Sequence, residues 1–172
     1  MSTFSAPELL TADHPLASFD CGKAALNNFL QRHALDKQNA MLSRTYVATR
    51  DGLVAGYYTL AVTTTLQSET PGKMGRGMPS VIPAILMARF AVDVNFQGQG
   101  LGRSLFTDAL RRTWAVMRSG AAPVRVFVVD AKDEDAKAFY ERFDMSAAPH
   151  NPLRLFLSYK TLRAEFESEM ET

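Results

Sequence analysis

Several residue types that mark common protein classes are scarce in this chain of 172 residues. It has one cysteine, Cys21, which excludes an internal disulfide and a cysteine-only zinc cluster. Its longest nearly unbroken apolar run, Val81–Ala88, is far shorter than the roughly 18 residues that span a membrane. Its N-terminus lacks a basic stretch followed by an apolar one, so we expect no secretory signal and a soluble, cytoplasmic protein.

The chain also lacks a clear excess of positive or negative charge, because its formal net charge is only +1. Its distribution is uneven. Residues 51–126 hold eight Lys or Arg and four Asp or Glu, a net charge of +4, whereas residues 127–172 hold six and ten, a net charge of −4. A basic middle can attract a polyanion because the local field matters more than the total. The alternative is that these charges are simply solvated faces.

Apolar residues make up 47% of the chain and charged residues 22%, the balance of an ordinary globular protein. We therefore predict a single domain over residues 1–172. It is expected to end in an acidic tail, about residues 163–172, that frays or forms a polar helix. Near the other end, the helical spacing of Leu26, Phe29 and Leu30 predicts an amphipathic helix over about residues 23–39.

A β-hairpin is predicted next. The pair Asp51-Gly52 separates two runs with strand character, residues 45–49 and 53–62. This dipeptide favours a two-residue turn in which both central residues have positive φ. Gly56, inside the return strand, indicates a bulge.

Strands and helices alternate in the second half, after a long irregular connection at residues 63–84 that has room for a short helix. The predicted elements are a strand at 85–94, a helix at 101–118, a strand at 124–129, a helix capped by Asp133 and a strand at 153–159. This alternation predicts an α/β or α+β fold, with helices on both faces of a sheet.

The segment Asp93–Ser104 carries the clearest chemical signal, because it follows a predicted strand, opens a predicted helix and is rich in glycine. Glycines let the backbone approach a ligand closely, and the first N–H groups of a helix have no internal partner. Together they form a site for a phosphate or pyrophosphate. Neither a Walker loop nor the G-x-G-x-x-G dinucleotide fingerprint is present, and a plain tight turn is the alternative reading.

This segment resembles the acetyl-CoA motif of the GCN5-related N-acetyltransferases, Q/R-x-x-G-x-G/A, at Gln97, Gly100 and Gly102. The later motif of that family is matched at Ala136 and Tyr140.

Two departures accompany the later match. Asp133 replaces the usual Asn, and Asp144-Met145 replaces the usual Gly-Phe. Asp133 can still cap the helix, and Asp at position 144 tolerates a left-handed backbone better than most residues.

The resemblance implies a central mixed, mostly antiparallel sheet flanked by helices, with splayed strands that hold acetyl-CoA. It implies no metal. The residues expected to bind acetyl-CoA are Ala91, Val92, Val94, Gln97, Gly98, Gln99, Gly100, Leu101, Gly102, Arg103, Ser104, Asp133 and Ala136. Tyr140 is the expected general acid, since a phenol is protonated at neutral pH and can donate to the departing sulfur. The alternative is that Tyr140 belongs to the core.

Five further stretches resemble the acetyltransferase toxins of type II toxin–antitoxin modules: Phe19–Gly22, Thr45–Ala48, Gly56–Leu60, Pro83–Asp93 and Ala131–Glu141. This resemblance implies acetylation of the α-amino group of aminoacyl-tRNA, inhibition of translation, a ribbon-helix-helix antitoxin and a homodimer. An α-amine titrates near pH 7.7–8.0, so an enzymatic base is not essential.

A tRNA acceptor needs cations for its phosphates. The expected contacts are Arg89, Arg76, Lys73, Arg32, Lys37 and Arg44. Arg111 and Arg112 either join them or solvate the outer face of their helix. His14, His33 and His150 lie outside both motifs and are expected to be structural or exposed. The open alternatives are acetylation of a small amine or a protein N-terminus, and a non-catalytic acyl-CoA-binding module.

Overall fold

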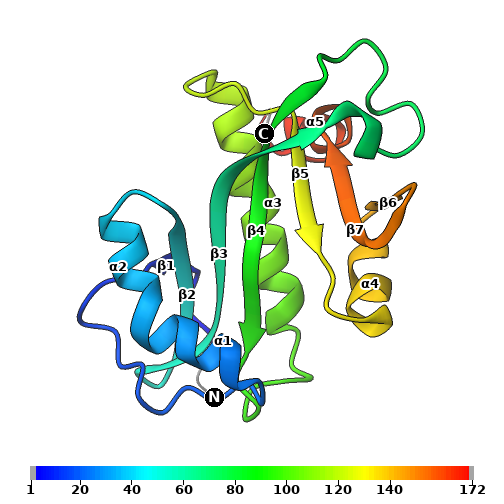
Figure 1. Cartoon of the computed structure of the whole chain (residues 1–172). Helices are drawn as coiled ribbons and strands as arrows, with labels where there is room; N and C mark the ends of the chain where they lie inside the picture. Colours follow the sequence, from blue (N-terminus) through cyan, green and yellow to red (C-terminus); the bar gives the residue numbers. More distant parts are fainter. Residues whose placement is uncertain (1–2, 171–172) are drawn as a thin grey trace. The chain divides into compact units, whose positions relative to one another are not determined.

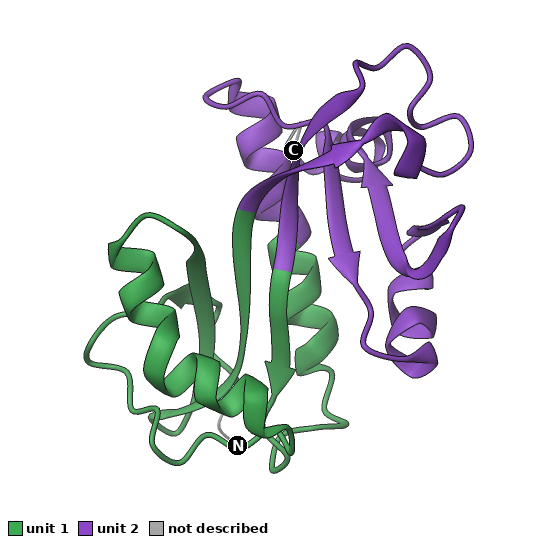
Figure 2. Cartoon of the chain, viewed as in Figure 1, with its two compact units in different colours: residues 1–61, 88–109 green, residues 62–87, 110–172 purple. Residues whose placement is uncertain are grey.

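The computed structural model describes residues 3–170, so the last two residues of the predicted acidic tail lie outside it. The chain divides into two compact units, shown in Figure 2. Unit 1 comprises residues 1–61 and 88–109, and unit 2 comprises residues 62–87 and 110–172. Over the described residues, every helix is too short or too polar to cross a membrane.

Seven strands form one sheet (Figure 1). In sheet order they are β1 (Glu8–Leu9), β2 (Arg44–Arg50), β3 (Leu53–Leu66), β4 (Val81–Val92), β5 (Val126–Asp130), β7 (Asn151–Ser158) and β6 (Ser146–Ala148). The pairing of β4 with β5 is parallel, and the β1–β2, β2–β3, β5–β7 and β6–β7 pairings are antiparallel. The predicted mixed, mostly antiparallel sheet is therefore confirmed.

The helical segments bear out most predictions, with shifted ends. They are α1 (Ala24–Asn28), a π-helical turn η1 (Phe29–His33), α2 (Ala34–Asn39), a 3₁₀ turn η2 (Gln67–Glu69), α3 (Leu101–Ser119), α4 (Glu134–Glu141), α5 (Tyr159–Phe166) and a 3₁₀ turn η3 (Glu167–Met170). The predicted helix at 23–39 exists, but the π-helical turn inside it was not predicted. The spacing of Phe29, Leu30 and Ala34 satisfies a helical pattern with or without the wider turn.

In unit 1, the hairpin forms as predicted, with Asp51 at φ 52° and Gly52 at φ 77°. The register of β2 and β3 shifts between Ala48 and Thr49, which leaves an extra residue in β3 directly beside Gly56. A Cβ atom at Gly56 would lie 2.7 Å from a methyl of Leu105, so α3 packs closely against this point of the strand. The predicted bulge is confirmed.

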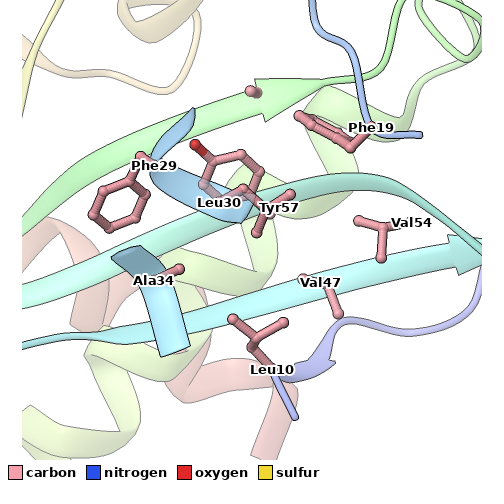
Figure 3. Packing of buried hydrophobic residues seen from close by; sticks show 9 residues of the cluster. Leu10, Phe19, Phe29, Leu30, Ala34, Val47, Val54 and Tyr57 are labelled. Atoms are coloured by element: carbon pink, nitrogen blue, oxygen red, sulfur yellow. The ribbon is translucent and has the colours of Figure 1, made fainter. Parts of the chain in front are cut away.

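The core of unit 1 lies between the helical segment α1–α2 and strands β2 and β3 (Figure 3). Its buried members are Leu10, Phe19, Phe29, Leu30, Ala34, Val47, Val54, Tyr57 and Ala91. The hydroxyl of Tyr57 donates to the carbonyl of Leu26 at 2.7 Å, which satisfies the polar end of a buried side chain.

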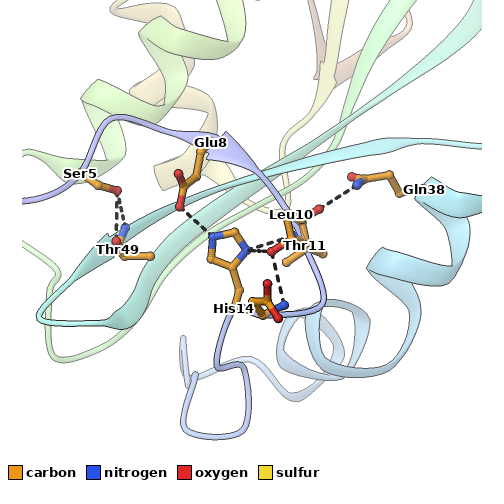
Figure 4. Close-up of polar contacts among 8 residues, drawn as sticks. Ser5, Glu8, Leu10, Thr11, His14, Gln38 and Thr49 are labelled. Carbon is orange, nitrogen blue, oxygen red and sulfur yellow. Dashed lines mark hydrogen bonds and ion pairs between the residues drawn. The ribbon is translucent and has the colours of Figure 1, made fainter.

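The N-terminal segment of unit 1 is held along β2 (Figure 4). The N–H of Ser5 donates to the carbonyl of Thr49 at 2.8 Å, and the N–H of Thr49 donates to the Ser5 hydroxyl at 2.9 Å. The imidazole of His14 contacts the Glu8 carboxylate at 2.8 Å. His14 therefore has a structural contact, as expected.

In unit 2, the connection between β3 and β4 is shorter than predicted, because β3 continues to Leu66 and β4 already begins at Val81. The strand predicted at 85–94 thus starts earlier and ends at Val92. Pro83 is accommodated near the start of β4, where its carbonyl accepts the N–H of Arg125 at 2.9 Å.

The C-terminal prediction was wrong in part. Helix α5 begins at Tyr159, after the Ser158 hydroxyl accepts the N–H of Thr161 at 3.1 Å. The predicted tail is helical as far as Met170, one of its two predicted outcomes, but its first residues belong to an amphipathic helix that buries Leu162 and Phe166. The short strand β6 was not predicted, since three residues carry too little periodicity.

Candidate active site

The strand that leads into the glycine-rich loop is held by a network around Asp93 in unit 1. The N–H of this buried residue donates to the carbonyl of Ala55 in the β3 bulge at 2.8 Å. Its carboxylate accepts the N–H groups of Asp20 at 3.0 Å and Asn95 at 2.9 Å. The N–H of Val94 donates to the carbonyl of Asp20 at 2.8 Å. The chain therefore leaves β4 in a defined direction.

The loop itself has the backbone that the sequence predicted. Gly98 and Gly100 have φ values of 76° and 83°, and apart from their chain neighbours no atom lies within 4 Å of a Cβ placed on either. The side-chain amide of Gln97 donates back to the carbonyl of Val92 at 2.9 Å. The loop is thus tightly turned and open on its outer side, where a ligand can approach the main chain.

Helix α3 starts directly after this loop. Its first turn contains no acidic residue. The N–H of Ser104 donates to the carbonyl of Gly100 at 3.2 Å, so the N–H groups of Leu101, Gly102 and Arg103 precede the first helical hydrogen bond. Their partial positive charge and the open glycines fit a pyrophosphate such as that of acetyl-CoA.

The remaining predicted contacts in unit 1 differ in exposure. Ala91 is buried and belongs to the core, whereas Val94 is 48% exposed. A Cβ on Gly102 would meet Phe90 and Val92 at ordinary contact distances of 3.7 and 3.9 Å. A small side chain therefore fits at this position, in agreement with a motif that accepts glycine or alanine there.

The second predicted motif lies in unit 2, on helix α4. The Asp133 carboxylate accepts the N–H of Ala136 at 2.8 Å and caps the helix, as predicted. Tyr140 is buried one turn further on, with its ring packed edge-on against Phe139 at 5.4 Å between ring centres. Burial, and secondarily the charge of Asp133, raises the pKa of the Tyr140 phenol well above its usual value. This phenol therefore keeps its proton at neutral pH.

The end of α4 also follows the prediction. Asp144 takes the left-handed conformation with φ 65°, where the family pattern has glycine. Its N–H donates to the carbonyl of Glu141 at 3.1 Å. Met145, in the place of the usual phenylalanine, is buried. The two departures from the motif thus preserve its local structure.

A basic cavity of about 660 Å³ lies in unit 2. Four cationic side chains line it: Lys73, Arg76, Arg125 and Lys160. The guanidinium of Arg125 lies over the ring of Tyr159, 5.2 Å from its centre. Of the described residues that line this cavity, none is acidic.

Lys73 and Arg76 were predicted to contact the acceptor, whereas Arg125 and Lys160 were missed. Arg125 lies just before β5, and Lys160 lies at the start of α5. Both are far in sequence from the connection between β3 and β4 that carries Lys73 and Arg76, and only folding brings the four together.

The other predicted acceptor contacts lie in unit 1. Arg32 and Lys37 are exposed on the α1–α2 segment, and Arg44 is exposed at the start of β2. The exposed Arg89 lies on β4, with its guanidinium 4.7 Å from the centre of the Phe29 ring and donating to the carbonyl of Ala88 at 2.8 Å. The six predicted cations therefore belong to two sets, one in each unit.

Helix α3 carries a different kind of surface in unit 2. Arg111 is 3.6 Å from the Glu169 carboxylate, and its guanidinium lies 5.7 Å from the centre of the Phe166 ring. These contacts join Arg111 to α5 and η3, which neither reading predicted. Within residues 3–170, no group of three or more His, Cys, Asp or Glu side chains is placed to hold a metal ion.

Comparison with known proteins identifies the family. The model of the acetyltransferase (GNAT) domain matches residues 42–144. A tRNA-acetylating toxin of Mycobacterium tuberculosis (strain ATCC 25618 / H37Rv) is 38% identical over 164 residues, which cover 95% of this chain and 98% of the relative. The chain therefore belongs to the GNAT acetyltransferase family.

Two solved structures extend the comparison. AtaT complexed with acetyl-methionyl-tRNAfMet is 30% identical with a TM-score of 0.87, over 95% of this chain and 99% of that one. A tyrosine-to-phenylalanine mutant of AtaT, bound to the C-terminus of the antitoxin AtaR and to acetyl-CoA, is 28% identical with a TM-score of 0.79, over 96% and 99%. The predicted GNAT fold is confirmed.

Proposed function

We propose that this protein is the toxin of a type II toxin–antitoxin module. It transfers the acetyl group of acetyl-CoA to the α-amino group of aminoacyl-tRNA and so inhibits translation. The observation that carries this proposal is the similarity to a tRNA-acetylating toxin over 98% of that relative's length. The open glycine loop and the protonated Tyr140 supply the chemistry that such a transfer needs.

Main-chain groups hold the donor. Acetyl-CoA supplies the acetyl group as a thioester. The N–H groups of Gln99 through Gly102 bind its pyrophosphate, with Gln97, Gly98, Arg103 and Ser104 around them. Backbone groups of Ala91, Val92 and Val94 bind the pantetheine amides in the manner of an added strand. Asp133 and Ala136 contact the coenzyme from the start of α4.

Tyr140 acts as the general acid. The neutral α-amine of the acceptor attacks the thioester carbonyl, a C–N bond forms, the C–S bond breaks, and Tyr140 donates its proton to the departing thiolate. The nitrogen loses a proton to solvent as it becomes an amide, and Tyr140 takes up a proton from solvent. The raised pKa of Tyr140 keeps that proton in place over the whole neutral range. The acceptor amine titrates near pH 7.7–8.0 and loses its proton to solvent, so no enzymatic base is required.

The basic cavity of unit 2 binds phosphates of the acceptor tRNA. Lys73, Arg76, Arg125 and Lys160 surround it, and Arg125 is preorganised over an aromatic ring. The exposed cations of unit 1, Arg32, Lys37, Arg44 and Arg89, add further phosphate contacts. Phosphate contacts dominate affinity and make it salt-sensitive.

The wider setting follows from this activity. The whole chain, residues 1–172, acts as one acetyltransferase domain, functions as a homodimer and works in the cytoplasm, where charged tRNA is found. A ribbon-helix-helix antitoxin neutralises it. A complex of AtaT with its antitoxin's C-terminus supports a protein partner of this class.

The test is direct. Purified protein, labelled acetyl-CoA and a panel of charged tRNAs are expected to yield N-acetyl-aminoacyl-tRNA. Absence of labelled product with every charged tRNA, while a free amine or a peptide N-terminus is acetylated, would replace tRNA by the second substrate class. Binding of acetyl-CoA without transfer to any amine would leave only an acyl-CoA-binding module.

A further inference from the structure

A single arginine links the hairpin of unit 1 to the glycine-rich loop. Arg50, the last residue of β2, donates to the side-chain oxygen of Gln99 at 2.7 Å. The two residues are 49 positions apart in sequence. Gln99 stands between Gly98 and Gly100, both with positive φ. A short charge-assisted hydrogen bond therefore reaches the part of the loop that is flanked by two glycines.

The guanidinium of Arg50 also lies beside two aromatic rings that contact each other. It lies 5.2 Å from the centre of Phe4 and 5.9 Å from the centre of Phe96, and the two rings meet edge-on at 5.8 Å. Phe4 is fixed because its neighbour Ser5 exchanges backbone and hydroxyl hydrogen bonds with Thr49 (Figure 4). Phe96 belongs to the loop. The arginine therefore has a defined position before it contacts Gln99.

The other contacts of the loop leave its glycine-rich stretch in need of further ordering, which the Arg50–Gln99 hydrogen bond can supply. The Asp93 network fixes the chain up to Phe96, whose N–H donates to the carbonyl of Asp93 at 2.9 Å. Between Phe96 and the first helical hydrogen bond at Ser104, the side-chain amides of Gln97 and Gln99 donate to the carbonyls of Val92 at 2.9 Å and Asn95 at 3.5 Å. The same stretch holds three glycines, which lose the most conformational freedom when they are ordered. A contact that orders this stretch before the ligand arrives lowers the cost of binding.

We infer that Arg50 is a positioning residue for acetyl-CoA: through Gln99 it holds the main-chain N–H groups of the loop in the arrangement that binds pyrophosphate. This inference rests on the proposed function, because acetyl-CoA is the ligand assigned to the loop. The role differs from that of a phosphate-binding arginine. The guanidinium hydrogen-bonds to the loop, and the main-chain N–H groups of the loop bind the ligand.

The test is a double-mutant cycle on acetyl-CoA binding, measured by calorimetry. Arg50→Ala and Gln99→Ala are each expected to raise the Kd for acetyl-CoA about tenfold, the usual size of the effect when a charge-assisted hydrogen bond is removed. Because both variants remove the same hydrogen bond, the double variant is expected to match the single ones. With saturating acetyl-CoA, kcat for acetyl transfer by Arg50→Ala stays at the wild-type value. Arg163→Ala, which removes an exposed arginine bonded to Glu167, is the matched control and keeps the wild-type Kd.

The outcomes separate this inference from the function on which it rests. If the wild-type protein does not bind acetyl-CoA, the proposed function fails. If it binds and Arg50→Ala binds equally well, or if the two single effects multiply in the double variant, only the role of Arg50 is overturned. A loss of affinity seen with acetyl-CoA but not with acetyl-dephospho-CoA would mean direct contact with the 3′-phosphate and would also overturn it. Should Arg50→Ala fail to fold, Gln99→Ala alone must still show the tenfold rise.

Discussion

Helices α3 and α4 begin in opposite ways, although both follow a strand of the sheet. The residue before α4 is Asp133, whose carboxylate accepts the N–H of Ala136, and Glu134 and Asp135 add negative charge to the first turn. The residue before α3 is Gly100, which has no side chain, and the first turn of α3 contains no acid. The start of α4 is therefore closed by its own chain, whereas that of α3 is left open.

The contrast indicates how the protein divides its tasks between main chain and side chains. Unsatisfied N–H groups at a helix start attract any negative charge, from the chain or from a ligand. At α3 the open start suits the diphosphate of a coenzyme. At α4 the capped helix instead supplies a rigid support for the phenol of Tyr140. In the proposed function, the start of α3 binds the coenzyme and α4 carries the general acid.

The largest expected effect tests the proposed role of Tyr140 on α4 in catalysis. Tyr140→Phe removes the proton that the thiolate takes up, and should lower kcat for acetyl transfer by about 10²- to 10⁴-fold. Acetyl-CoA binding should remain within twofold or so, because α3 is untouched. Single-turnover kinetics and calorimetry on the same samples measure both. Tyr46→Phe, which removes a phenol from β2, is the control. A large loss of coenzyme affinity in Tyr140→Phe would contradict the division of labour.

The pH profile of the wild-type enzyme tests the same residue. The raised pKa of Tyr140 means that the phenol stays protonated as the pH rises past its usual value near 10. The rate of acetyl transfer should therefore rise as the acceptor α-amine deprotonates around pH 7.7–8.0 and reach a plateau. A decline of kcat between about pH 8 and 9.5, with intact tRNA ester, would assign the acid to a group of lower pKa.

Closing the start of α3 should weaken acetyl-CoA binding. Gly100→Asp places a carboxylate where α4 has one, so that it competes with the pyrophosphate for the same N–H groups, and the Kd for acetyl-CoA should rise about 100-fold or more. The matched control is Gly52→Asp, at the hairpin turn, where φ is also positive at 77° and the space is equally open. Equal reductions of affinity in both variants would mean that backbone strain, and not the site, is responsible.

Charge reversal in the basic cavity should act on the acceptor alone. Replacing Arg125 and Lys160 by Glu should raise the KM for aminoacyl-tRNA about tenfold at moderate salt. It should also reduce the slope of log KM against log salt by roughly 0.7–0.9 for each phosphate that is no longer neutralised. The KM for acetyl-CoA should not change. Arg163→Glu is the control for net charge. A salt dependence equal to that of the wild type would remove the cavity from the tRNA-binding surface.

The smallest effect concerns the cap of α4. Asp133→Ala should lower the free energy of unfolding by about 1 kcal/mol, whereas Asp133→Asn keeps a capping oxygen and should cost only a few tenths. Chemical denaturation of the two variants measures the difference. If both variants were equally destabilised, the charge of Asp133 and not its cap would matter.

Local signals carried most of the predicted fold. The hairpin at Asp51-Gly52, the glycine loop and the Asp133 cap depend on residues within a few positions of one another, so the sequence pattern suffices to place them. Strand ends were harder. Near the start of β4, the carbonyl of Pro83 accepts the N–H of Arg125, more than 40 positions away, and no local pattern around Pro83 indicates this partner.

Short stretches of sequence were enough to predict which backbone positions turn, cap a helix or open toward a ligand, because φ preferences and helix ends are properties of neighbouring residues. The burial of Tyr140, the basic cavity completed by Arg125 and Lys160, and the hydrogen bond from Arg50 to Gln99 became visible only in the folded chain. Burial and charge clustering arise from contacts between segments that are distant in sequence, and such contacts exist only once the chain has folded.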